Sequence, residues 1–193
     1  MSEISFQTSS KKSDSSSAGL AREPLMARLA RDLEHDPFWS SILDAGAGSQ
    51  PRDWSLHVAV FQEPFLTWLL DGRKTVESRF SQNQVAPFGE VQAGDVIAIK
   101  KVGGPIVGIC MVGATWSYRL DPKTWLQIRD RFARVICAEN DEFWEARREA
   151  RFATLISVDH VRPTSDIAYP KNDRRGWVVE QNRIAQGHLN LWP

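Results

Sequence analysis

The chain has 193 residues, of which 42% are apolar, and its 24 basic and 24 acidic side chains give a net charge of zero at pH 7. This length allows one domain with an extension, and the apolar fraction is sufficient for an independently folding core. A neutral chain has no general attraction for nucleic acid or anionic membranes, so any affinity for phosphate must come from a local basic patch. No apolar run approaches the roughly 20 residues that cross a bilayer. We therefore expect a cytoplasmic protein without a membrane partner.

The first part of the chain is predicted to lie outside the main domain. Residues 1–22 are rich in serine and poor in bulky apolar residues, which predicts a disordered tail. Residues 23–53 are predicted to form a helical arm and a linker, because apolar residues recur at helical spacing, at Leu25, Leu29 and Leu33. Packing on the main domain, capping of a partner and contact with a second subunit remain open for this arm.

The main domain is predicted to span residues 54–193 and to be of the α+β class. Two glycines, Gly108 and Gly113, interrupt its longest apolar stretch, which is typical of bulges where a sheet curls. Alternating and helical apolar patterns predict strands over residues 56–61, 75–80, 96–101, 106–118, 152–161 and 177–180, and helices over residues 64–71, 123–136 and 140–151.

The segment Gly72–Arg79 is unusually charged for a strand in a core-forming sheet. Gly72 is suited to end the preceding helix, because glycine readily adopts the left-handed conformation of a helix C-terminus. In the strand that follows, Val76 and Phe80 are predicted to face the core. The opposite and more accessible face is predicted to carry the polar side chains of the segment, namely Lys74, Thr75, Glu77 and Arg79.

These side chains are suited to a phosphate-bearing or base-bearing ligand. Arginine offers a planar fork to phosphate and lysine a mobile point charge, while Glu77 can orient Arg79, accept a hydrogen bond from a base or act as a general base. The alternative is a structural network of ion pairs that closes a barrel. The candidate ligand-binding residues are Arg73, Lys74, Thr75, Glu77, Arg79 and Trp116, the last as a stacking surface for a base.

The sequence resembles a known family at this point. A strand, a short helix, Gly-x-Lys-x-x-Glu-x-Arg at Gly72–Arg79, Gly94-Asp95 before a strand and a glycine turn together resemble the ASCH domain of the PUA-like superfamily. The resemblance covers residues 56–161. It implies a small PUA-like β-barrel with flanking helices, and a cleft in which the family is proposed to bind RNA or other nucleic-acid ligands. Some small members resemble amidohydrolases that act on acetylated cytidine, and nuclease activity has been ascribed to others.

Two functions follow as expectations. The first is binding of RNA or a nucleotide-like ligand. The second is hydrolysis of a modified nucleoside or RNA, with Lys74 and Glu77 as the acid and base. In the amidohydrolases a lysine matching Lys74 works with a threonine three residues later, whereas this chain carries Glu77 there. A third possibility is protein interaction through the tryptophan-bearing N-terminal helices. The sequence gives no indication of the oligomeric state.

No metal or cofactor site is predicted. The four histidines, at positions 35, 57, 160 and 188, show no ligand spacing with each other or with the cysteines, and no Walker loop or dinucleotide fingerprint occurs. Cys110 and Cys137 each lie in an apolar segment. We expect both to be buried, reduced thiols.

Overall fold

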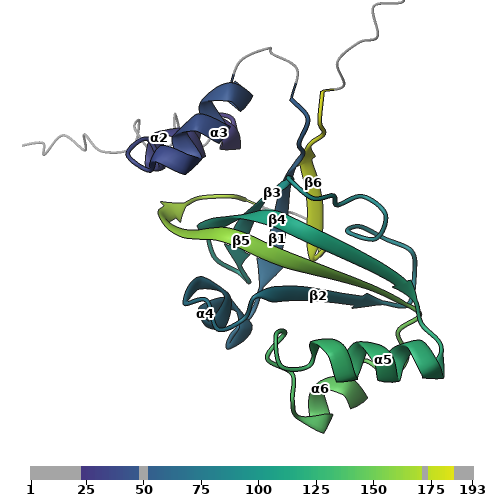
Figure 1. Ribbon diagram of the computed structural model, residues 1–193. Helices are drawn as coiled ribbons and strands as arrows, with labels where there is room; N and C mark the ends of the chain where they lie inside the picture. Colours follow the sequence, from purple (N-terminus) through teal and green to yellow (C-terminus); the bar gives the residue numbers. More distant parts are fainter. Residues whose placement is uncertain (1–22, 48–51, 171–173, 185–193) are drawn as a thin grey trace, which may run out of the picture.

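The computed structural model describes residues 23–47, 52–170 and 174–184, so the predicted tail over residues 1–22 lies outside the described residues. A six-stranded sheet with the order β2-β5-β4-β3-β1-β6 curls into a half-barrel, with helices on both sides (Figure 1). Neighbouring strands are antiparallel except β1 and β3, which run parallel. The predicted α+β fold with a barrel-like sheet and flanking helices is confirmed.

Most predicted elements are present. The strands are β1 (Leu56–Phe61), β2 (Val76–Ser81), β3 (Val96–Lys101), β4 (Ile106–Arg119), β5 (Phe152–Ile167) and β6 (Trp177–Gln181). The helices of the described residues are α2 (Leu25–Asp32), α3 (Pro37–Ala47), α4 (Phe65–Leu70), α5 (Pro122–Phe132) and α6 (Asp141–Glu145). No helix among these is long and apolar enough to span a membrane.

Some element ends differ from the prediction. Strand β5 extends past the predicted end at residue 161 because it continues to pair with β4 as far as Ile106 and Ile167. Helix α5 ends at Phe132, and the carbonyl of Val135 accepts hydrogen bonds from the N–H groups of Thr75 and Val76 instead of continuing the helix. The chain after α5 is therefore tied to the start of β2.

Glycines allow β4 and β5 to curl closely together. A Cβ atom at Gly113 would lie 2.2 Å from a carboxylate oxygen of Asp159, and the pairing of β4 with β5 shifts register between Val112 and Thr115. Pairing also shifts beside Gly108. The predicted association of these two glycines with irregular, curved strand is confirmed.

The N-terminal helices pack on the sheet of their own chain. Leu29 and Leu43 are fully buried in a core cluster that also contains Val58 of β1 and Ile109 of β4. The indole N–H of Trp39 donates to the carbonyl of His160 over 3.0 Å. Helices α2 and α3 lie on the side of the sheet opposite α5 and α6 (Figure 1). Of the three placements left open by the sequence, the structure shows packing on the main domain.

Helices α5 and α6 cover β2 from the other side. Each begins at a side-chain cap, since Asp121 accepts from the N–H of Thr124 and Asn140 from the N–H of Phe143. Their aromatic residues form a second core cluster with Phe80 and Val76 of β2. One face of β2 is therefore packed against helices.

We expect the α2 packing to contribute strongly to stability. Leu29→Ala should lower the free energy of unfolding by about 2–5 kcal/mol, because a fully buried leucine leaves a cavity when truncated. The control is Leu126→Ala in α5, because Leu126 is 65% exposed. Its free energy of unfolding is expected to change by about 0.5 kcal/mol or less. Urea unfolding measures both, and equal decreases in the two variants would contradict the packing of α2 on the sheet.

Candidate functional site

Lys74 is buried at the junction of α4 and β2. Gly72 ends α4 with a φ of +81°, as predicted for a left-handed C-terminal residue, and the N–H of Lys74 bonds to the carbonyl of Trp68. The Lys74 side chain is only 2% exposed, and its ammonium donates to the carbonyl of Val76 over 2.6 Å. The prediction that Lys74 swings over an accessible surface is wrong, because the turn directs it between the helix and the strand.

Glu77 is buried beside it. A carboxylate oxygen of Glu77 lies 3.1 Å from the Lys74 ammonium, and its other oxygen lies 2.7 Å from Nε of Arg79. Burial acts to raise the pKa of Glu77, but the positive charges of Lys74 and Arg79 outweigh it and hold the pKa below its ordinary value. Glu77 is therefore ionised at neutral pH.

The side chains of β2 alternate between two faces as predicted, but the face that carries Glu77 is not accessible as predicted. Val76 and Phe80 pack against α5 and α6, as expected of the core-facing side. The other side carries Glu77, which is 5% exposed and not accessible. The physical reason is the curl of the sheet, which turns this second side toward the inside of the half-barrel, where Phe61 and Trp177 form part of another core cluster.

Arg79 links the two edges of the sheet. Strands β2 and β6 are these edges, and Arg79 of β2 donates to the carbonyls of Val60 over 2.9 Å and Gly176 over 3.2 Å. Its guanidinium also lies over the rings of Phe61 and Trp177, at 5.0 Å and 5.3 Å from the ring centroids. Arg79 thus has the contacts of the structural alternative, in which an ion-pair network closes the barrel.

A pocket of about 270 Å³ opens beside this network and is called the Lys74 pocket below. Four charged side chains and four phenylalanines line it: Lys74, Glu77, Arg79, Arg147, Phe61, Phe65, Phe80 and Phe143. It therefore combines a buried, compensated carboxylate with flat apolar surfaces.

Arg147 was not predicted to belong to the site. The predicted helix over residues 140–151 ends earlier, at Glu145, and the chain turns, so that Arg147 lines the Lys74 pocket. Its guanidinium stacks 3.7 Å over the Phe143 ring and donates to the carbonyl of Phe143. Burial lowers the pKa of Arg147, against the effect of the Glu77 charge. Nothing in the sequence indicated this role, because position 147 lies within the helix predicted over residues 140–151.

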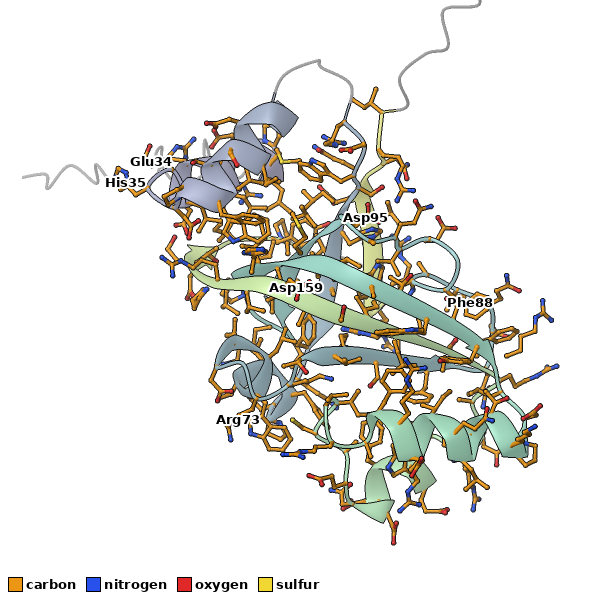
Figure 2. All side chains as sticks on the ribbon, viewed as in Figure 1. Glu34, His35, Arg73, Phe88, Asp95 and Asp159 are labelled. Carbon is orange, nitrogen blue, oxygen red and sulfur yellow. The ribbon has the colours of Figure 1, made fainter. Side chains whose placement is uncertain are left out.

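Three predicted ligand-binding residues do not line this pocket. Arg73 is exposed, forms an ion pair with Asp71 and points outward beside α4 (Figure 2). Thr75 is also exposed. Trp116 packs against Phe132 at 5.2 Å between ring centroids. The structure brings together Lys74, Glu77 and Arg79 and leaves Arg73, Thr75 and Trp116 outside.

The Gly94-Asp95 pair of the motif lies away from the Lys74 pocket and has structural contacts. Asp95 accepts hydrogen bonds from the N–H groups of Ser55 and Gln92 and lies 3.1 Å from His57. It also lies within 2.9 Å of Arg183 beyond β6. Figure 2 places Asp95 at the end of the sheet opposite Arg73. This buried cluster ties the start of β3 to β1 and to the chain after β6.

The cysteines and histidines form no site among the described residues. Cys110 is buried as predicted, but Cys137 is partly exposed, because it lies in the turn after α5 with a φ of +57°. Burial is the main cause that raises the pKa of both thiols, which disfavours the reactive thiolate. Across residues 23–47, 52–170 and 174–184, no three His, Cys, Asp or Glu side chains could together hold a metal ion.

Comparison with known proteins finds similarity at the level of the fold. No family model matches the sequence, and no curated protein matches it. Among solved structures, ASCH from Zymomonas mobilis is 17% identical, with 58% of this chain and 73% of that chain covered and a TM-score of 0.46. Protein EF3133 from Enterococcus faecalis V583, of family-model DUF984, is 14% identical, with 73% and 99% covered and a TM-score of 0.45. The predicted resemblance to ASCH domain proteins is thus found again among structures, at low sequence identity.

The free energy of unfolding is expected to depend on pH through Glu77. Folding lowers the pKa of this carboxyl from 4.5. The ionised Glu77 therefore stabilises the fold above that pH, and the stabilisation is lost as the pH falls through the lower folded value. Glu77→Gln should remove this acid-dependent loss, so its unfolding free energy should vary less between neutral pH and about pH 3 in urea titrations.

Glu90→Gln is the matched control for this prediction, because Glu90 is exposed. Its unfolding free energy should keep the full pH dependence of the native chain. The same pH dependence in native protein and Glu77→Gln would show that Glu77 has no lowered pKa in the folded state.

Proposed function

We propose that the protein binds RNA or a nucleotide-like ligand by holding one unpaired base in the Lys74 pocket. The observation that supports this most is Glu77, an ionised carboxylate on the wall of a pocket otherwise lined largely by phenylalanines and cations. A carboxylate accepts hydrogen bonds from the exocyclic amino group of a base. Unstacked bases are held by aromatic rings and arginine planes, and Arg147, whose guanidinium lies over Phe143 and lines the pocket, supplies such a plane.

The size of the pocket favours a single base. A volume of about 270 Å³ lies just below the range of pockets for drug-sized ligands, about 300–1,000 Å³. A double helix does not enter a hollow of this kind. The proposed ligand is therefore an unpaired nucleotide, which falls within the RNA or other nucleic-acid ligands implied by the resemblance of Gly72–Arg79 to ASCH domains.

The neighbouring cations are proposed to hold Glu77 rather than to bind phosphate. The Lys74 ammonium has the carbonyls of Val76 and Ile136 and the carboxylate of Glu77 as acceptors. Arg79 directs its guanidinium at Glu77 and at two backbone carbonyls. Both side chains thus have protein acceptors, and the carboxylate they hold repels an anion. A base is a better occupant than a phosphate here.

Hydrolysis is a second candidate because the Lys74 ammonium lies 3.1 Å from a carboxylate oxygen of Glu77 and both residues line the pocket. A general base works best with a pKa near the operating pH. The lowered pKa of Glu77 makes it a weak base at neutral pH. This is why we place binding before turnover.

We expect nucleosides with an exocyclic amino group to bind more tightly than uridine, which has none. A good hydrogen-bonded contact to a base edge contributes about 1–3 kcal/mol of discrimination, so cytidine should bind roughly 5-fold or more tightly than uridine. Glu77→Gln should reduce this preference, and Glu90→Gln should keep it. Isothermal titration calorimetry with the four nucleosides measures the effect. Equal affinities for cytidine and uridine would contradict a contact between Glu77 and the base.

Arg147→Gln provides a second variant that does not disturb the buried ion pairs. It should lower the affinity for all four nucleosides by a similar factor, because it removes a stacking surface and not the acceptor of the amino group. Mass spectrometry of the same mixtures, with acetylated cytidine added, tests turnover. Product that forms with the native chain and is absent with Glu77→Gln would favour the hydrolase over pure binding.

A further inference from the structure

A second hollow adjoins the Lys74 pocket. It has a volume of about 470 Å³ and shares three lining residues with the first, namely Val60, Val102 and Gly176. Because Arg174 also lines it, we call it the Arg174 hollow. The two spaces therefore meet along the opening between the edges of the sheet, where Arg79 reaches Gly176.

The Arg174 hollow has a different charge from the Lys74 pocket. Lys100, Arg174 and Arg175 line it, and its described lining contains no acidic side chain. Lys100 is 6% exposed and donates to the carbonyls of Lys101 and Gly104, whereas Arg174 and Arg175 are exposed. In a chain of zero net charge, three cations in one hollow form the kind of local patch that attracts an anion.

Gly176 lines both spaces. Gly176 has no side chain, and its carbonyl is already bound by the N–H of Val60 and by Arg79. A Cβ atom there would lie 3.3 Å from a guanidinium nitrogen of Arg79. Beside it, Val102 is 56% exposed. A ligand that spans the two spaces would therefore pass apolar surface and a backbone carbonyl that is already paired.

We infer that the Arg174 hollow binds a phosphodiester group adjacent to the base held in the Lys74 pocket. The ligand class is then a single-stranded RNA segment rather than a free nucleoside. The assignment of base and phosphate to the two spaces follows from their lining. The carboxylate and the phenylalanines of the Lys74 pocket favour a base, and the cations of the Arg174 hollow favour a phosphate. The inference rests on the proposed function, since it places the base in the Lys74 pocket.

The test compares nucleosides with RNA homotrinucleotides of adenosine, cytidine, guanosine and uridine. The native chain should bind each preferred trinucleotide at least about 10-fold more tightly than the matching nucleoside, and only the trinucleotide affinity should fall steeply with salt. Arg174→Gln with Arg175→Gln should abolish the gain and reduce the salt slope by about 0.7 for each phosphate that is no longer neutralised. The nucleoside affinities should stay unchanged.

Arg31→Gln with Arg148→Gln is the matched control, because it removes two arginines that line neither space. It should keep the native trinucleotide affinity. Nucleosides that bind as tightly as trinucleotides, or equally weakened trinucleotide binding in the two double variants, would overturn the phosphodiester site and leave the base pocket standing. Failure of every nucleoside and trinucleotide to bind would overturn the proposed function itself.

Discussion

The buried carboxylate of Glu77 is the constraint on which the site depends. A charge removed from water is tolerated only when opposite charges and hydrogen bonds compensate it. Lys74 and Arg79 supply that compensation from 3.1 Å and 2.7 Å. The backbone places the partners. Gly72 turns the chain so that Lys74 points inward, and the curl of the sheet brings the Glu77 side of β2 inside.

The same contacts stabilise the half-barrel and shape the pocket. Arg79 joins β2 to the carbonyls of Val60 and Gly176, so the two edges of an open sheet are held together at one point. The pocket lies beside this link, and Phe143 of α6 also lines it. The structural and the ligand-binding alternatives for the charged segment are therefore compatible. In the proposed binding mode, the cations hold the carboxylate and the carboxylate contacts the base.

The sequence predicted the elements and the location of the charged cluster better than its surroundings. Period-two alternation correctly placed Val76 and Phe80 toward the core. The preference of glycine for a helix C-terminus correctly predicted that α4 ends before Gly72. Burial of Glu77 was not predictable, because the curl of the sheet arises from pairing between distant strands. Arg147 was missed for a related reason. Its direction depends on where α6 ends, and helix ends are set by local turns and packing that periodicity does not report. Trp116 was an aromatic residue of a strand, and only the docking of α5 shows what covers it.

The most direct test of the proposed binding mode is the titration of the Glu77 side-chain carboxyl by carbon NMR, with and without cytidine at saturation. The expected result is a pKa below 4.5 in the free protein. The carboxyl resonance should also change when cytidine binds, with no such change at Glu90. A Glu77 that titrates at or above 4.5, or whose resonance stays constant while cytidine binds, would contradict the claim that an ionised, buried carboxylate contacts the base.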